Sequence, residues 1–253
     1  MFVDTHCHLF KSYYENIDNV IKGANFNLVN TYINNGSDIK SNKEVLELLK
    51  IYPNMYGALG IHPEVVDKYC EEDLDFIRNN LNNDKVVAIG EIGLDYYYTK
   101  ENKDKQLKLF RKQLAMAEEY DLPVIVHSRE ATEDTINTLK EYKVRGVIHS
   151  FSGSLETAKI YIKMGFLLGV NGVITFKNAK LKDVIKEVGL QNIVLETDSP
   201  YLTPEPFRGQ KNSPENVFYI AKFLGELFYV SLSEVANITN DNVYKMYKKM
   251  VID

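Results

Sequence analysis

Short apolar runs that end at a histidine or an acidic residue recur along the whole sequence. They are FVDTHCH with His6 and His8, VVAIGE with Glu91, PVIVH with His127, GVIH with His149, and NIVLETD with Asp198. Such runs are typical of parallel strands buried on both faces, whose carboxyl ends deliver side chains to the edge where the loops begin. Four imidazoles and two carboxylates at such an edge indicate a metal site.

The apolar runs predict eight strands, separated by segments that can hold helices. The predicted strands span residues 2–6, 27–33, 55–61, 86–91, 123–127, 146–149, 165–170 and 192–196. Apolar residues at helical spacing predict helices over 103–120, 132–142, 154–164, 178–188 and 213–228, a shorter one around 17–21, and a last one over 232–250. Alternating strands and helices favour parallel strands with crossover connections.

Eight such units predict an α/β chain folded as a single-domain (β/α)8 TIM-like barrel over residues 1–253. The competing architecture is an open doubly wound sheet. An open sheet gathers its ligands at one switch point, whereas the candidate ligands here follow the first, fourth, fifth, sixth and eighth strands. A closed barrel brings these five strand ends together, so the barrel is the preferred prediction.

Composition argues against several classes of protein. The net charge of -5 argues against binding of nucleic acid through a broad basic surface, although bound divalent cations can reverse the local field and still admit such a substrate. Cys7 and Cys70 lack CxxC spacing and predict no disulfide framework. Neither a secretory signal nor an apolar run of about 18 residues is evident. We therefore expect a cytoplasmic protein with no membrane partner and no obligate protein partner.

The spacing of the first two histidines favours metal binding. His6 and His8 project to the same side of a strand, together with Asp4. A lone HxH would fit two hydrogen-bonded structural histidines equally well, but six candidate ligands exceed the three protein ligands of a single catalytic zinc. The set predicts two divalent ions per chain that share a bridging carboxylate. Their identity stays open among Zn, Mn, Mg, Fe and Ni, with magnesium preferring oxygen ligands.

Two such ions predict hydrolysis. A two-metal site ionises a bridging water near neutral pH and polarises a phosphoryl or carbonyl oxygen, so the expected nucleophile is a metal-bridging hydroxide. Asp198 is expected to accept the proton of the nucleophile, because a carboxylate at the metal lies within reach of the bound water. The ligand set does not choose between phosphate, ester and amide substrates.

The motifs, taken in order, resemble those of the TatD-type metal-dependent hydrolases of the amidohydrolase-like superfamily. The resemblance is carried by DTHCHL at 4–9, GIHP at 60–63, GEIGLDYY at 90–97, PVIVHSR at 123–129, HSFSG at 149–153, ETDSPYLTP at 196–204 and RGQKNSP at 208–214. These motifs cover nearly the full length of the chain at plausible spacing, so the match is specific.

The resemblance implies a (β/α)8 barrel, two divalent ions and metal-dependent DNase activity, which in several members is a 3′ exonuclease. Carried over by position, it implies one ion on His6, His8, Glu91 and Asp198, and the other on Glu91, His127 and His149. Glu91 would bridge the ions, and Glu91 and Asp198 would be the catalytic residues. Many members of the superfamily use a carboxylated lysine as the bridge, so Glu91 favours the TatD-like branch.

Three further residues are predicted to bind substrate: His62, Arg129 and Arg208. In the family, the GIHP histidine lies on the substrate side, so we expect His62 to contact phosphate rather than to have a structural role. Arg129 suits a bidentate phosphate contact, with a salt bridge to a neighbouring carboxylate such as Glu130 as the alternative. Arg208 and Asn212 follow the eighth strand, where barrel enzymes often bind phosphate, although a loop folded by its own Pro and Gly residues is as good an interpretation.

The residues after the fourth strand leave more than one interpretation open. Tyr96, Tyr97 and Tyr98 suit stacking on bases, but packing explains at least two of them in a chain with 17 tyrosines. Asp95 is expected either to orient a metal ligand or to form a turn.

We therefore expect a two-metal deoxyribonuclease that cleaves DNA phosphodiester bonds in single strands or at ends. One alternative is a metal-dependent hydrolase of an ester or amide in a small molecule or an aminoacyl-tRNA. Another is a non-catalytic metal-binding protein, against which the six intact ligands argue.

Overall fold

The predicted strands are all present in the computed structural model, which describes residues 1–251. They are β1 (Phe2–Cys7), β2 (Val29–Asn35), β3 (Met55–Leu59), β4 (Val86–Asp95), β5 (Val124–Arg129), β6 (Gly146–Ile148), β7 (Phe166–Val170) and β8 (Ile193–Leu195). These strands follow one another in a single sheet in chain order, from β1 to β8. The register of the described pairs is parallel.

Helices separate the consecutive strands. They are α1 (Ile17–Phe26), α2 (Ile39–Ile51), α3 (Glu71–Asn80), α4 (Lys103–Glu119), α5 (Thr132–Leu139), α6 (Leu155–Lys163) and α7 (Leu181–Val188), and β8 is followed by α8 (Val217–Phe228) and α9 (Leu232–Met246). Strand order and alternation confirm the predicted α/β class with (β/α)8 topology. None of the described helices has the length and apolar character needed to cross a bilayer.

Contacts divide the chain into two compact units. Unit 1 comprises residues 1–34 and 150–245, and unit 2 comprises 35–149 and 246–253. The prediction of one domain over 1–253 stays a prediction, and its last two residues lie outside the described part.

Unit 1 holds β1, β7 and β8 with most of β2. Leu168 pairs with Ile193 between β7 and β8, and Phe2 pairs with Val29 between β1 and β2. The loop after β8 returns to β1: the Asp198 N–H donates to the His6 carbonyl at 2.8 Å. This return places the residues after β8 beside the end of β1, where the first two predicted ligands stand.

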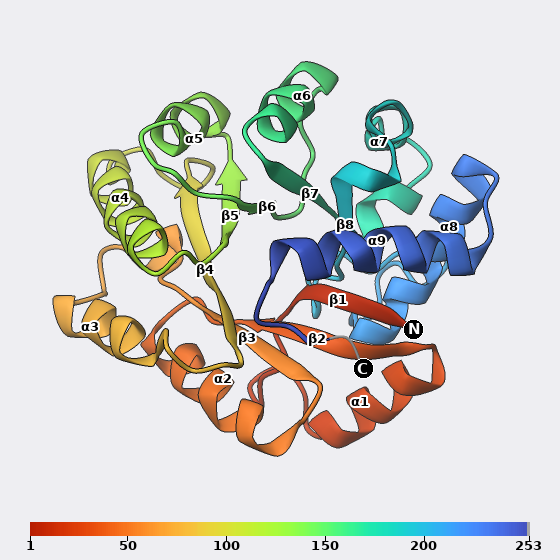
Figure 1. Cartoon of the computed structure of the whole chain (residues 1–253), viewed down its shortest axis with the longest axis horizontal. Helices are drawn as coiled ribbons and strands as arrows, with labels where there is room; N and C mark the ends of the chain where they lie inside the picture. Colours follow the sequence, from red (N-terminus) through yellow and green to blue (C-terminus); the bar gives the residue numbers. More distant parts are fainter. Residues whose placement is uncertain (252–253) are drawn as a thin grey trace. The chain divides into compact units, whose positions relative to one another are not determined.

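Unit 2 holds β3 to β6, with α2 packed on β3, α4 on β4 and α5 on β5 (Figure 1). Strand β4 continues past Glu91 to Asp95, farther than predicted. The extension is stable because Ile92 and Leu94 are buried and Ile92 pairs with Val126 of β5. The predicted helices do not include α2 and α3, although Asp38 caps α2 by accepting from the Ser41 N–H at 2.7 Å.

Two buried glutamines of α4 hold the ends of β3 and β4. The Gln113 amide accepts from the Ile61 N–H at 2.7 Å and donates to the Ile61 carbonyl at 3.0 Å. Gln106 makes the same paired contact with Asp95, with both distances 2.8 Å. Because irregular backbone at a strand end has no ladder partner, these amides satisfy it and position the residues that follow.

Replacing Gln113 by leucine is expected to destabilise the fold by about 2 to 4 kcal/mol, because the Ile61 N–H and C=O would stay buried without partners. Chemical unfolding followed by circular dichroism measures the change. Lys108→Leu, at an exposed position of the same helix, is the matched control, with an expected change within about 0.5 kcal/mol. A Gln113→Leu protein as stable as the wild type would show that Ile61 does not depend on this amide.

Candidate metal-binding site

Unit 1 gathers three of the predicted ligands, His6, His8 and Asp198, which we name the first cluster. The Nε2 atoms of His6 and His8 lie 3.2 Å apart. An Asp198 carboxylate oxygen lies 3.4 Å from Nε2 of His8 and 3.8 Å from Nε2 of His6. One ligand atom from each residue therefore lies within 4.8 Å of the other two.

The first cluster is built by a buried strand and a tight loop. His6 is fully buried in β1, and the strand alternation that predicts a common side for His6 and His8 is confirmed by their facing Nε2 atoms. Asp198 has a φ of 55°, a left-handed conformation that aspartate tolerates better than most residues. The loop therefore turns the carboxylate back toward β1.

Asp4 secures this loop rather than joining the cluster. Its carboxylate accepts from the Thr197 N–H at 2.9 Å, from the Thr197 hydroxyl at 2.6 Å and from the His6 N–H at 3.2 Å. Burial raises the pKa of Asp4 to about 8, against the opposing effect of these hydrogen bonds. Strand parity puts Asp4 on the same side as His6 and His8, and the structure shows that Asp4 ties the β8 loop to β1.

Glu196 is a buried carboxylate that sequence reasoning did not select. Its Oε1 accepts from the Ser150 N–H at 2.7 Å, and one of its oxygens lies within 4.8 Å of a His6 ring nitrogen. A Cβ at Gly169 would stand 2.3 Å from Glu196 Oε2, so the glycine makes room for this side chain. The signal was available, since Glu196 directly follows the apolar run of β8.

Unit 2 gathers Glu91, His127 and His149, which we name the second cluster. A Glu91 carboxylate oxygen lies 3.1 Å from Nδ1 of His127 and 3.8 Å from Nε2 of His149. The three residues come from β4, from β5 and from the position after β6, as predicted. The role of Glu91 as a bridge between two ions stays a prediction.

Asp95 orients His127 by contacting the ring nitrogen that does not face Glu91. Its Oδ2 lies 2.8 Å from Nε2 of His127, while its Oδ1 accepts from the Tyr97 N–H at 2.9 Å. Burial acts to lower the pKa of His127, but the hydrogen bonds to Asp95 and Glu91 outweigh it and raise the pKa to about 9. With Nε2 engaged by Asp95, Nδ1 is the nitrogen that faces Glu91, the arrangement in which a carboxylate fixes a metal-binding imidazole. The structure supports both roles expected for Asp95, which are to orient a predicted metal ligand and to form a turn.

His62 stands at the edge of the second cluster. Its Nε2 lies 3.5 Å from a Glu91 oxygen, and its ring contacts His127 edge-on with centroids 4.5 Å apart. Its Nδ1 accepts from the Glu64 N–H at 3.3 Å. In a neutral imidazole the hydrogen then resides on Nε2, so His62 presents a donor toward Glu91. A donor suits an anionic oxygen better than a metal ion.

The two predicted substrate arginines lie on aromatic rings. The Arg129 guanidinium carbon lies 3.6 Å from the centroid of Tyr97. The Arg208 guanidinium carbon lies 4.3 Å from the centroid of Phe176. Their contacts with substrate stay predictions.

Asn212 has a structural role in the loop after β8. Its Nδ2 donates to the Thr197 carbonyl at 3.0 Å and to the Tyr201 carbonyl at 2.5 Å, and the residue is fully buried. These contacts hold the backbone of the loop at Thr197 and Tyr201.

Both clusters fit a divalent cation by their donor chemistry. In the first cluster, two imidazole nitrogens and a carboxylate oxygen lie within 4.8 Å of one another. In the second cluster, one Glu91 oxygen lies 3.1 Å from Nδ1 of His127 and 3.8 Å from Nε2 of His149. A ring nitrogen of His62 also lies within 4.8 Å of ligand atoms of Glu91 and His127. Mixed nitrogen and oxygen donors suit zinc, manganese, iron or nickel.

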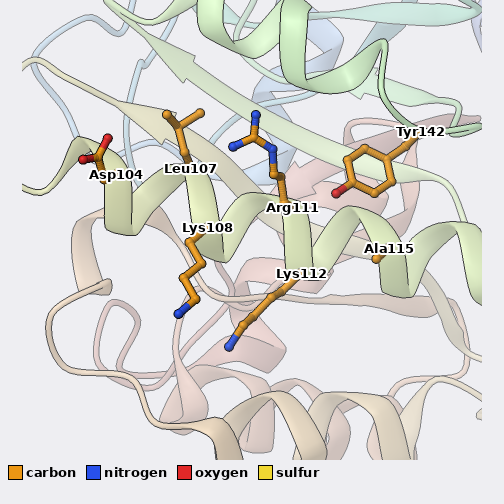
Figure 2. Close-up of a pocket in the computed structure, with 7 residues that line it drawn as sticks. All are labelled: Asp104, Leu107, Lys108, Arg111, Lys112, Ala115 and Tyr142. Atoms are coloured by element: carbon orange, nitrogen blue, oxygen red, sulfur yellow. The ribbon is translucent and has the colours of Figure 1, made fainter.

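A hollow of 540 Å³ on α4 contains none of the predicted site residues. Figure 2 shows Lys108, Arg111 and Lys112 along this helix. Arg111 pairs with Glu141 at 2.9 Å, and Lys112 pairs with Glu71. Because these two cations are paired with carboxylates, the hollow is a poor surface for a polyanion.

Comparison with known proteins places the chain in a family. The family model described as TatD related DNase matches residues 3–248. YabD of Bacillus subtilis strain 168, an uncharacterized metal-dependent hydrolase, is 41% identical over 253 residues, which cover 98% of this chain and 99% of the relative. The crystal structure of YjjV, a TatD homolog from Escherichia coli K12, has a TM-score of 0.91 at 34% identity and covers 98% of both chains. A TatD family hydrolase from Entamoeba histolytica has a TM-score of 0.87 at 26% identity, again covering 98% of both. The chain therefore belongs to the TatD-related DNase family and is a metal-dependent hydrolase.

Proposed function

We propose that the protein is a deoxyribonuclease that hydrolyses DNA phosphodiester bonds with two divalent ions, one held by each cluster. The observation that carries metal-dependent hydrolysis in this proposal is the presence of two sets of imidazole and carboxylate donors with closely spaced ligand atoms. The family model, described as a DNase, supports DNA as the substrate. Because the sequence resemblance implies a 3′ exonuclease in several members of the family, we prefer this mode of cleavage, acting on single strands or ends.

The chain's own residues would divide the work of hydrolysis. When bound, the two ions polarise the phosphoryl oxygens and make a water molecule easier to ionise. Asp198, with a side chain 15% exposed and next to His8, accepts the proton of the attacking water. His62 donates from Nε2 to a phosphate oxygen, and Arg129 supplies a fixed positive charge to the same group. Asp95 keeps His127 in place.

The charge of the molecule favours ends and single strands over long duplexes. A net charge of -5 disfavours binding of a duplex backbone through a broad basic surface, and Arg111 and Lys112 are paired with carboxylates. Binding then depends on the few phosphates that reach the clusters.

Digestion of end-labelled single-stranded DNA with added Mn²⁺ or Mg²⁺ tests the proposal. The wild type is expected to shorten the strand, Glu91→Ala is expected to leave it intact, and Glu187→Ala, at an exposed position of α7, is the matched control that keeps activity. No turnover by the wild type, with Glu91→Ala equally inactive, would refute the nuclease. Cleavage of carboxylic esters or aminoacyl-tRNA instead would favour the alternative hydrolase.

Replacing His62 by alanine is expected to lower kcat/KM for DNA about 10- to 100-fold, because one hydrogen bond to a charged oxygen is lost. The metal content per chain should equal that of the wild type, since the donor on Nε2 is not a ligand. Elemental analysis and steady-state kinetics measure the two quantities. Loss of one ion per chain would place His62 among the ligands.

A further inference from the structure

The three consecutive tyrosines after β4 have different environments. Tyr96 is buried, and its hydroxyl donates to Asp134 at 2.9 Å, which explains it as a structural residue. Tyr97 and Tyr98 are 52% and 69% exposed, and their rings meet edge to face with centroids 4.9 Å apart. Two adjacent large rings thus face water on the same short segment.

Arg129 joins these rings. Its guanidinium carbon lies 3.6 Å from the Tyr97 centroid and 5.4 Å from that of Tyr98. A planar cation over an aromatic face keeps its edge donors available, so Arg129 can still bind an anionic oxygen. We name Tyr97, Tyr98 and Arg129 the platform.

The platform adjoins the second cluster through direct contacts. One carboxylate oxygen of Asp95 contacts His127, and the other accepts from the Tyr97 N–H. The Tyr96 N–H donates to the Arg129 carbonyl at 2.9 Å. Arg129 also follows His127 by two positions in β5, so strand alternation directs both side chains to one side. Asp95 therefore links Tyr97 directly to His127, a predicted metal ligand.

A hollow of 290 Å³ borders Tyr98 and is lined by polar side chains that include Glu64, Asp95 and Asn102. Two carboxylates in its wall disfavour a phosphate. A nucleobase is uncharged, carries amino donors that carboxylates and amides accept, and has a flat face that stacks on tyrosine. The hollow therefore suits a base, while the cationic side of the platform suits the phosphate attached to it.

We propose that the platform and its hollow bind one nucleoside of the substrate, with the base stacked on Tyr98 and the adjoining phosphate directed to Arg129. This inference rests on the proposed nuclease function and deepens it. A base inside a duplex is stacked on both sides, so Tyr98 can stack on a base only in a single strand or at the end of a strand. The geometry therefore favours single strands and strand ends over the interior of a duplex.

Paired substrates test the subsite. Each pair consists of a single-stranded oligonucleotide with an intact terminal base and the same strand with an abasic tetrahydrofuran at that position, prepared for the 3′ and for the 5′ end. For one of the ends, the metal-loaded wild type is expected to favour the intact strand in kcat/KM about 5- to 100-fold, the range for stacking of one base on an aromatic side chain. Tyr98→Leu should remove most of this preference, and Tyr98→Phe should retain it.

The controls separate the two proposals. Phe26→Leu, which alters an aromatic side chain that is 87% exposed on α1, should keep the wild-type preference. If the wild type cleaves none of the strands, the nuclease proposal fails. If it cleaves intact and abasic strands equally at both ends, or if Tyr98→Leu keeps the full preference, the nuclease stands and the subsite is refuted.

Discussion

Replacing Asp198 by asparagine is expected to lower kcat for single-stranded DNA about 100- to 10,000-fold at saturating divalent metal. Asparagine keeps the shape of the side chain and an oxygen directed toward His8, which lies 3.4 Å from the carboxylate. Its neutral amide, however, accepts no proton from the attacking water. Because the lost interaction belongs to the transition state, kcat and kcat/KM should fall together while KM changes little. Initial rates on an end-labelled oligonucleotide, across a titration of Mn²⁺, measure the effect.

The matched control is Asp183→Asn, which removes an exposed carboxylate from α7 and is expected to change kcat less than twofold. Wild-type kcat in Asp198→Asn would exclude Asp198 from proton transfer. If added metal restored the full rate of Asp198→Asn, Asp198 would act only as a metal ligand. This result would likewise exclude it from proton transfer.

Separate loss of the two ions is the second large effect that we expect. The metal-replete wild type should contain two divalent ions per chain, His8→Ala and His127→Ala about one each, and the double variant close to none. Each single change removes a donor from only one cluster, since His8 faces His6 and Asp198, whereas His127 faces Glu91. A site reduced below three protein ligands holds a divalent ion weakly. Elemental analysis after desalting gives the metal content.

Cys70→Ala is the control for adventitious binding, because Cys70 is an exposed thiol, and its metal content should equal that of the wild type. Two ions retained in His8→Ala would exclude the first cluster as a metal site. Loss of both ions from either single variant would contradict two independently filled clusters.

Much of the fold could be predicted from local patterns. Strands that are buried on both faces, such as β4 and β5, appear as continuous apolar runs, and α4 shows clear helical periodicity. The end of β4 could not be placed in this way, because Gly93 and Asp95 carry no apolar signal and their pairing depends on β5. The paired amides of Gln106 and Gln113 were equally invisible, since a buried glutamine resembles any polar helix residue until its partner is known.

The candidate ligands could be predicted because each stands at or just beyond the end of an apolar run. His6 and His8 also share strand parity, and their facing Nε2 atoms follow from it. Glu196 satisfied the same rule and was passed over in favour of Asp198. The roles of the neighbouring residues could not be predicted. Strand parity put Asp4 on the side of His6 and His8 without showing its role, and three adjacent tyrosines offered no reason to separate Tyr96 from Tyr98.

By itself the sequence determined the order of strands and helices and the chemical identity of the candidate ligands, because strand burial and the placement of residues at strand ends are local properties. Only the tertiary structure decided which side chains hold the candidate ligands and the neighbouring loops in place. Asp95 orients His127 from 32 positions away, and Asp4 holds Thr197 from 193 positions away. Hydrogen bonds of this kind depend on the distance between side chains in space, and no local pattern records that distance. For the same reason, only the fold shows that Tyr96 is a buried structural residue whereas Tyr97 and Tyr98 are exposed.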